Sequence, residues 1–278
     1  ARLVRKRRTL LVLDGIEPLQ YPENDPSGQG GMLKDDGLAA LLQRLIPQKQ
    51  VAAEEAPHLT NLDIRMLESP VVAVEQSRKE VLRMADACRQ MMSGLKELTH
   101  QETPDPELMK QILEMEDRQD VIQDEVVTLM SNLLVSNVPH DVVDEARVQL
   151  RMADEYESVS DCIATVLKAH RTLYKHNVRL PTVQQEELHE LHDMVAGYLD
   201  LVSQSSEKSG RAEVVMEALP RGELITKHAK TLYKRLLAKP PAEQIEARSM
   251  VSYNRQVAAY RRIRDHLVNI AEALAGEK

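Results

Sequence analysis

The chain has 278 residues, 42% of them hydrophobic, which is enough for one large domain or two ordinary ones with well-formed cores. It contains no Phe, no Trp and only seven Tyr, so we expect a core of Leu, Val, Ile, Met and Ala, which favours packed helices over β-sandwiches. The formal net charge of -8 argues against a nucleic-acid partner, because binding to phosphate backbones needs clustered Lys and Arg. Two cysteines without a paired Cys or His motif are typical of a reduced, cytoplasmic protein.

Residues 1–56 differ in composition from the rest of the chain. A strand-like stretch, "TLLVLDG", is followed by the turn-rich "YPENDPSGQGG" and by the short apolar-periodic "GLAALLQRL". This order predicts a short, irregular α/β-like segment or linker. No run of apolar residues in the chain is long enough for a membrane span, since the apolar stretch of "TLLVLDGI" is interrupted by Asp14.

From about residue 70 onward, apolar residues recur at helical spacing between proline and turn clusters, and we predict an all-α fold with six long helices. The first covers about 70–98 after the cap "SP", and the second follows "TPDPE". The others begin after "VPHD", at "PTVQQ", near residue 212 and after "KPPAEQ", the fifth with a break at Pro220. We group them as two three-helix bundles, residues 57–178 and 179–278.

The two predicted bundles show an internal repeat. "RMADEYESVSDCIATVLKAH" of the third helix aligns with "RQVAAYRRIRDHLVNIAEAL" of the sixth at an offset of 104 residues, the offset from Tyr156 to Tyr260. The same offset pairs Asp161 with Asp265. The sequence therefore predicts that one three-helix unit occurs twice.

Acidic pairs with a spacing of four residues are the candidate metal ligands. Glu157 and Asp161 lie on the third helix, and Glu116 and Asp120 lie on the second. Carboxylates four residues apart project from neighbouring turns, and two such helices could form the oxygen-rich shell that hard divalent cations or iron prefer. Because Glu157 and Asp161 lie opposite the apolar stripe of their helix, we place them at the bundle surface. The alternative interpretation is an ordinary solvated helix face.

The stretch "HELHD" offers a second candidate, with His189 and His192 at a spacing of three residues. No H-E-x-x-H motif accompanies them. We therefore interpret them as a surface histidine pair and not as a zinc site.

The repeated helices resemble the PhoU family, whose third-helix signature joins an acidic E-x-x-x-D to a short apolar run, here in "ADEYESVSD" and "YRRIRDHLVNIAEAL". "HLTNLDIRMLESPVVAVEQSRKEVLRMAD" is similar to the start of the PhoU-like cytoplasmic domain of bacterial sodium/phosphate cotransporters. The resemblance covers residues 57–278. It implies two pseudo-symmetric three-helix bundles, a non-enzymatic accessory or regulatory role in inorganic phosphate transport, and E-x-x-x-D motifs that bind iron, zinc or another divalent metal.

This resemblance also implies a partner and a location. The partner is the membrane domain of a transporter or a phosphate-signalling protein, at the inner face of the cell membrane, and a homodimer is a further assembly that we consider. Carried over by position, the metal ligands are Glu157, Asp161, Glu116 and Asp120.

The second repeat departs from the pattern of the family. Asp265 is kept, but Arg261 stands four residues before it, and Arg262 and Arg264 add positive charge. Like charges repel a cation, so we expect no second metal cluster there. A guanidinium at this place could instead bind the carboxylate of a partner or a phosphate.

Residues 1–45 resemble another family. "RTLLVLDGIEPLQYP" and "GMLKDDGLAALLQRL" look like the Walker B region of STAND-type signalling NTPases, but no P-loop G-x-x-x-x-G-K-[ST] occurs. We expect neither nucleotide binding nor enzyme activity from this segment, which could be a fusion remnant. Three hypotheses remain: a PhoU-like accessory domain, a purely structural helical domain without metal, and an inactive fragment of an NTPase fusion.

Overall fold

The computed structural model describes residues 62, 69–207, 211–238 and 246–276. The chain divides into two units, Ala1–Pro57 and His58–Lys278, and every described residue belongs to the second. The α/β-like segment predicted for residues 1–56, with its Walker B-like stretch, therefore lies outside the described residues.

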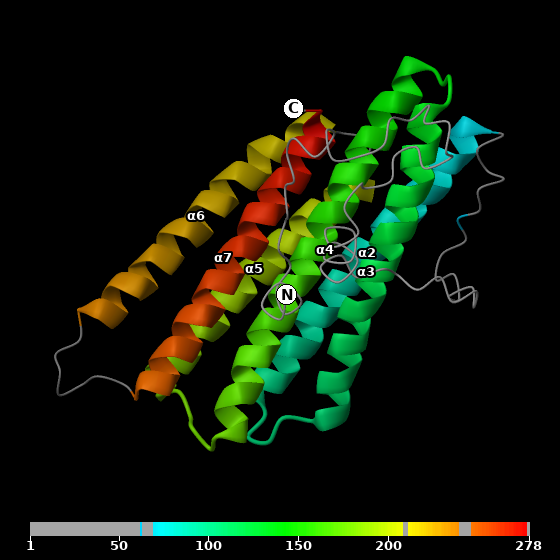
Figure 1. Cartoon of the computed structure of the whole chain (residues 1–278). Helices are drawn as coiled ribbons and strands as arrows, with labels where there is room; N and C mark the ends of the chain where they lie inside the picture. Colours follow the sequence, from blue (N-terminus) through cyan, green and yellow to red (C-terminus); the bar gives the residue numbers. More distant parts are fainter. Residues whose placement is uncertain (1–61, 63–68, 208–210, 239–245, 277–278) are drawn as a thin grey trace, which may run out of the picture. The chain divides into compact units, whose positions relative to one another are not determined.

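The described ranges form six α-helices and contain no strand, which confirms the predicted all-α fold for this part of the chain (Figure 1). The helices are α2 (Pro70–His100), α3 (Pro106–Val135), α4 (His140–Lys175), α5 (Thr182–Glu207), α6 (Arg211–Leu237) and α7 (Ala247–Ala275).

Local sequence signals explain where several helices begin and end. A proline occupies the first position of both α2 and α3, where the missing N–H removes no helical hydrogen bond. The side chain of Asp105 caps α3 by accepting a hydrogen bond from the backbone N–H of Glu107 at 2.9 Å. At the other end of the chain, α7 stops at Gly276, whose φ of 77° is the left-handed conformation that glycine adopts at little cost.

The predicted break at Pro220 is wrong, because α6 continues from Arg211 to Leu237 with Pro220 inside it. A proline removes one backbone donor from a helix, which leaves the carbonyl of residue 216 without its usual partner. Met216 is 80% exposed and Pro220 is exposed as well. Solvent can therefore satisfy that carbonyl, and the apolar side of α6 keeps the helix in place.

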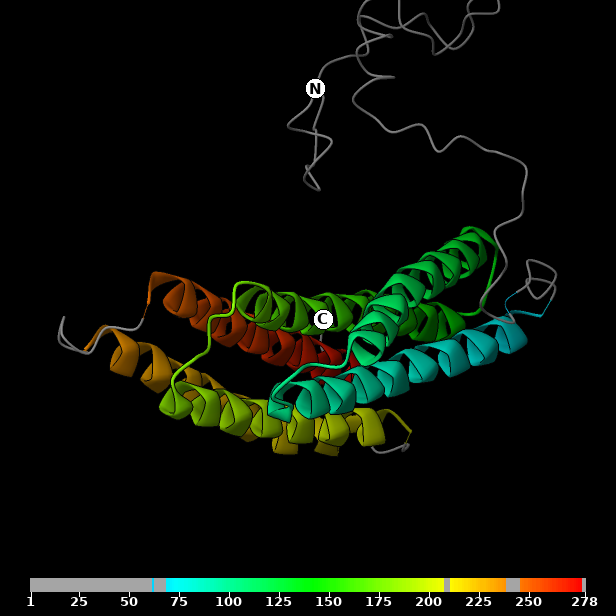
Figure 2. The ribbon, with the colours of Figure 1, turned by 90° about the horizontal axis from the view of Figure 1, so that it is seen from below.

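The six helices pack in two sets of three. In each set, α2, α3 and α4 or α5, α6 and α7, every helix packs against the other two. Contacts between α4 and α7 and between α2 and α5 join the sets. Figures 1 and 2 show α4 beside α7, with α3 and α6 on opposite outer sides. Across the described ranges, no helix combines the length and apolar content that a bilayer span requires.

The core differs in one respect from the aliphatic one that composition predicts. Alongside the aliphatic and Met side chains, four tyrosines are almost fully buried: Tyr156, Tyr198, Tyr253 and Tyr260. Two of their hydroxyls have clear polar partners, since Tyr253 donates to Glu187 Oε2 at 2.6 Å and the Tyr260 hydroxyl lies 3.0 Å from His192 Nδ1. For Tyr253 and Tyr260, a polar partner in the core offsets the cost of burying the hydroxyl.

Candidate metal centre

The acidic pairs predicted from sequence meet where α3 packs against α4. One carboxylate oxygen from each of Asp120, Glu157 and Asp161 lies within 4.8 Å of the other two. All three side chains are half-buried. Among the described residues, no other group of three or more His, Cys, Asp or Glu side chains brings its ligand atoms this close together. We call these three residues the acidic cluster.

The fourth predicted ligand, Glu116, borders the acidic cluster. Its carboxylate makes a hydrogen bond with Asp161, and Lys168 Nζ donates to its Oε1 at 3.3 Å. Burial raises the pKa of Glu116 and Asp161 raises it further, whereas Lys168 lowers it. The net shift is upward, so the site disfavours another negative charge beside the three carboxylates.

Glu157 and Asp161, which the sequence predicts at the bundle surface, lie outside the apolar core. Both are half-buried, because α3 covers the side of α4 that carries them. The periodicity of α4 alone placed these residues opposite its apolar stripe, but a neighbouring helix can cover that side with polar contacts as well. A half-buried carboxylate group interacts with a cation more strongly than a fully solvated one, since less water screens it.

Neighbouring side chains hold the two helices and orient the acidic cluster. On α4, Ser158 Oγ donates to Glu157 Oε2 at 3.3 Å. On α3, Gln119 is fully buried, and its Nε2 donates to the carbonyl of Met84 on α2 at 2.8 Å. Because Gln119 precedes Asp120 directly, this bond between helices fixes the height at which Asp120 faces α4.

The donor set decides which cations fit. Carboxylate oxygens suit hard cations such as Mg²⁺, Mn²⁺ or Ca²⁺ and also iron, whereas zinc sites are commonly completed by His or Cys. Within the described ranges, the acidic cluster contains neither of those residues. Asp120, Glu157 and Asp161 would hold the cation, and Glu116, which interacts with Asp161, borders them.

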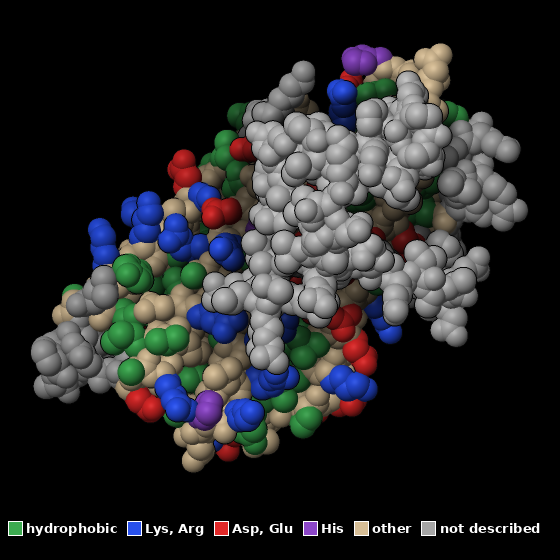
Figure 3. Space-filling model, viewed as in Figure 1, with side chains coloured by type: hydrophobic (Ala, Val, Ile, Leu, Met, Phe, Trp, Pro, Cys, Tyr) green, Lys and Arg blue, Asp and Glu red, His purple; other side chains and the backbone are tan. Residues whose placement is uncertain are grey.

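The stretch of α7 that aligns with the acidic cluster in sequence has different chemistry. Asp265 is exposed and forms an ion pair with Arg264, at 2.6 Å between Oδ1 and Nη1. Arg264 also donates from Nε to the carbonyl of Gly222 on α6 at 2.9 Å. The offset of 104 residues places Pro220 and Leu224 where α3 has Glu116 and Asp120. Figure 3 shows Lys and Arg side chains gathered over α6 and α7.

The histidines of "HELHD" are not a surface pair. His192 is 3% exposed and packs edge-on against Tyr260, while His189 is half-buried and stacks on His100. Burial lowers the pKa of His192 to about 4. Helical spacing placed both residues correctly on one helix, but it could not indicate that α7 covers His192.

Sequence reasoning missed Lys168, the cation beside the acidic cluster. A signal was present, because Lys168 follows Asp161 by seven residues, two turns along the same side of α4. It also missed Glu155, which accepts hydrogen bonds from His266 Nδ1 at 2.7 Å and Asn269 Nδ2 at 2.9 Å across the contact of α4 with α7. No short-range pattern in the sequence indicates that second contact.

Comparisons with protein-family models, with curated proteins and with solved structures found no match for this chain. The resemblance to the PhoU family therefore stays a prediction, and the candidate metal centre rests only on the geometry of α3 and α4.

Proposed function

We propose that residues 58–278 form a non-enzymatic, PhoU-like accessory or regulatory domain that binds a divalent cation at the acidic cluster and acts in inorganic phosphate transport. The observation that carries the proposal is the convergence of Asp120, Glu157 and Asp161, with one oxygen of each within 4.8 Å of the others. The packing of six helices in two sets of three supports the same family.

Electrostatics favours a cation at this place. Two carboxylates whose oxygens lie within 4.8 Å of each other repel each other by at least roughly 3 kcal/mol at an effective dielectric constant of about 20. Lys168 forms an ion pair with Glu116, so its positive charge balances that carboxylate more than the three of the acidic cluster. A divalent cation between Asp120, Glu157 and Asp161 would replace repulsion by attraction, which is the physical reason to expect affinity for it.

The proposal assigns no catalysis to the domain. The full sequence contains neither a G-x-S-x-G nucleophile elbow nor a P-loop. A bound cation would instead fix α3 against α4 and set the shape of that outer side for a partner. The partner that we propose is the membrane domain of a sodium/phosphate cotransporter or a phosphate-signalling protein at the inner face of the cell membrane.

Elemental analysis of the purified full chain tests the metal. We expect about one divalent metal ion, iron or manganese, per chain, since three carboxylates form one oxygen shell. The double variant Glu157→Gln with Asp161→Asn keeps the size of both side chains and should lose the metal. Asp265→Asn, the matched change on α7, should keep it. Wild-type chain that stays free of metal after incubation with Fe²⁺ or Mn²⁺ would overturn the metal assignment.

Uptake of radioactive inorganic phosphate tests the biological role. Cells of the native host that carry the double variant should take up phosphate at a changed rate or with a changed response to phosphate supply, and the Asp265→Asn strain should match the parent. Unchanged uptake in a strain whose variant has lost its metal would show that the acidic cluster does not act in phosphate transport.

One observation favours a second candidate, a structural helical domain without metal. Lys168 already provides a cation 3.3 Å from Glu116, and a protein ammonium group can balance a carboxylate group without a metal ion. For this candidate, added Mn²⁺ should leave the melting temperature of the wild-type chain unchanged. The metal-binding domain should melt at a higher temperature when Mn²⁺ is present, because ligand binding stabilises the folded state.

A further inference from the structure

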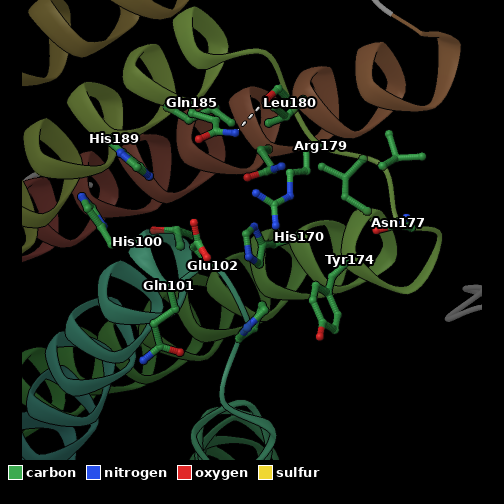
Figure 4. A pocket seen from close by; sticks show the side chains of 16 residues that line it. His100, Gln101, Glu102, His170, Tyr174, Asn177, Arg179, Leu180, Gln185 and His189 are labelled. Carbon is green, nitrogen blue, oxygen red and sulfur yellow. Dashed lines mark hydrogen bonds between the residues drawn. The ribbon is translucent and has the colours of Figure 1, made fainter.

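A cavity of about 340 Å³ lies at one end of the helices, away from the acidic cluster. Its walls come from the end of α2 and the loop after it, from the last turns of α4, from the loop between α4 and α5, and from the start of α5 (Figure 4). Small-molecule sites begin at about this size. The two three-helix sets meet here, and each contributes part of the wall.

The end of α4 places Arg179 at this cavity. Asn177 adopts a left-handed conformation with φ of 52°, and the backbone N–H of Val178 donates back to the carbonyl of Leu173 at 3.0 Å. This pattern ends a helix sharply and turns the chain away from its axis. Asn tolerates the left-handed region better than most residues. The residue that follows the turn is Arg179.

Two further hydrogen bonds fix the loop that carries Arg179. Ser249 Oγ of α7 donates to the backbone carbonyl of Arg179 at 3.4 Å, and Gln185 Nε2 of α5 donates to the carbonyl of Leu180 at 2.7 Å. The backbone at the mouth of the cavity is thus held by both neighbouring helices. Because folding already orders this loop, a ligand that binds there does not bear the entropic cost of ordering it.

The side chains of Arg179 and His170 are available to a ligand. Among the described residues, no carboxylate lies within ion-pair distance of the Arg179 guanidinium. In the same ranges, no side chain or backbone group forms a hydrogen bond with the His170 ring. Figure 4 shows the guanidinium pointing toward that ring. His170 is half-buried, and its burial lowers its pKa. A guanidinium beside an imidazole, both lining a cavity, is chemistry that binds an oxyanion.

The other histidines of the cavity do not form a metal site with His170. His100 and His189 stack with ring centroids 3.9 Å apart and an angle of 16° between the planes. The lone pairs of an imidazole lie in the plane of its ring, so two nearly parallel rings cannot aim them at one ion. Consistently, none of the three belongs to a group of converging ligand atoms in the described ranges.

An apolar wall completes the cavity. Leu173, Leu180 and Leu188 line it, and all three are largely buried. An inorganic ion alone would leave this wall and much of the volume unused. The combination therefore selects a ligand with a charged end and a carbon body.

We propose that this cavity binds a small organic anion whose phosphate or carboxylate group contacts Arg179 and His170 and whose carbon body lies against Leu173, Leu180 and Leu188. Glu102 is the carboxylate among the lining residues, and it lies exposed on the loop after α2. Its negative charge weakens the attraction for an anion. This site is independent of the metal proposal, since the cavity and the acidic cluster share no residue.

Calorimetric titration of the full chain tests the site, with phenyl phosphate, benzoate and inorganic phosphate as probes. We expect phenyl phosphate or benzoate to bind one per chain, and inorganic phosphate to bind at least about 10-fold more weakly because it does not contact the leucines. Arg179→Gln should weaken binding by about 10-fold or more, and Glu102→Gln should strengthen it. Arg171→Gln, an exposed arginine of α4 outside the cavity, is the matched control and should bind as the wild type does.

The outcomes separate the parts of the proposal. Absence of binding by all three probes, or equal affinity of the wild type and Arg179→Gln, would overturn the anion site. Inorganic phosphate that binds as tightly as phenyl phosphate would overturn the organic ligand. Binding of phenyl phosphate by the double variant Glu157→Gln with Asp161→Asn should equal that of the wild type, so failure of the metal proposal would leave this result unchanged. Circular dichroism of each variant confirms that it folds.

Discussion

The acidic stretch of α4 and the arginine-rich stretch of α7 align with each other in sequence at an offset of 104 residues. Tyr156 and Tyr260, related by the offset of 104 residues, are both almost fully buried. The side chains that follow them differ, because Glu157 and Asp161 converge with α3, whereas Arg261 is exposed and Asp265 is paired with Arg264. This pair of core positions is alike, and the side chains that follow it differ in charge.

The largest expected effect tests the shared core. We predict that Tyr156→Ala and Tyr260→Ala each lower the free energy of unfolding by about 3–5 kcal/mol, since each leaves a cavity at a fully packed site. Urea denaturation measures both. Tyr174→Ala, at a tyrosine that is 48% exposed, should change stability by less than about 0.5 kcal/mol. If the free energy of unfolding fell by less than about 1 kcal/mol in one of the two core variants, the two tyrosine positions would not be equivalent.

The next effect separates the sets by acid sensitivity. His192 is buried against Tyr260, whereas the residue 104 positions earlier is Cys88, whose thiol donates to the carbonyl of Tyr156 at 3.4 Å. The pKa of His192 falls from its ordinary 6.5 to about 4. The unfolded chain binds the proton first, so the folded state loses up to about 3 kcal/mol as the pH falls from about 6.5 to about 4.

The variant His192→Gln removes this titration. Between pH 6.5 and pH 4, His192→Gln should lose less stability than the wild type, by up to about 3 kcal/mol. Urea denaturation at each pH measures the difference. Identical pH profiles for the two chains would show that His192 is not the acid-sensitive group.

The contact between the sets should respond to pH in the opposite direction. Hydrogen bonds to Cys162 and to Glu155 raise the pKa of His266 to about 9. Its contribution to stability is complete below its unfolded pKa of about 6.5 and is lost as the pH rises through about 9. His266→Gln should therefore cost about 1–3 kcal/mol at pH 6 and less at pH 9.5. A cost that grows with pH would contradict the charged bond between His266 and Glu155.

The smallest effect compares Glu116 of α3 with Asp265 of α7 in the chain without metal. Glu116→Gln should stabilise the metal-free chain at neutral pH by about 0.5 kcal/mol, because the raised pKa of Glu116 shows that its surroundings disfavour the charge. Asp265→Asn should lower stability by at most about 1 kcal/mol, since it removes an exposed ion pair with Arg264. Thermal unfolding in the presence of EDTA measures both, and equal signs would contradict the contrast between the acidic side chains at the contact of α3 with α4 and the ion pair on α7.

Much of the helical architecture could be predicted from the sequence. The proline caps of α2 and α3 and the apolar spacing of α4 depend on neighbours in the chain, so local patterns were sufficient. Pro220 was the exception, since α6 continues through it where both Met216 and Pro220 are exposed.

The candidate site could be predicted only in part. Each E-x-x-x-D pair is a local pattern, but whether the two pairs come close together depends on the relative rotation of the packed helices α3 and α4. The cavity beside Arg179 and His170 had no signal, since its walls come from segments far apart in the chain. The burial of His192 was missed for the same reason, because α7 covers it from more than sixty residues away.

Calorimetric titration of Mn²⁺ into the metal-free full chain tests the central claim most directly. One site should be found in the wild type, with affinity unchanged in Asp265→Asn and weakened by at least about 100-fold when Glu157→Gln and Asp161→Asn are combined. Equal Mn²⁺ affinity in the wild type and in that double variant would contradict a cation site at the acidic cluster.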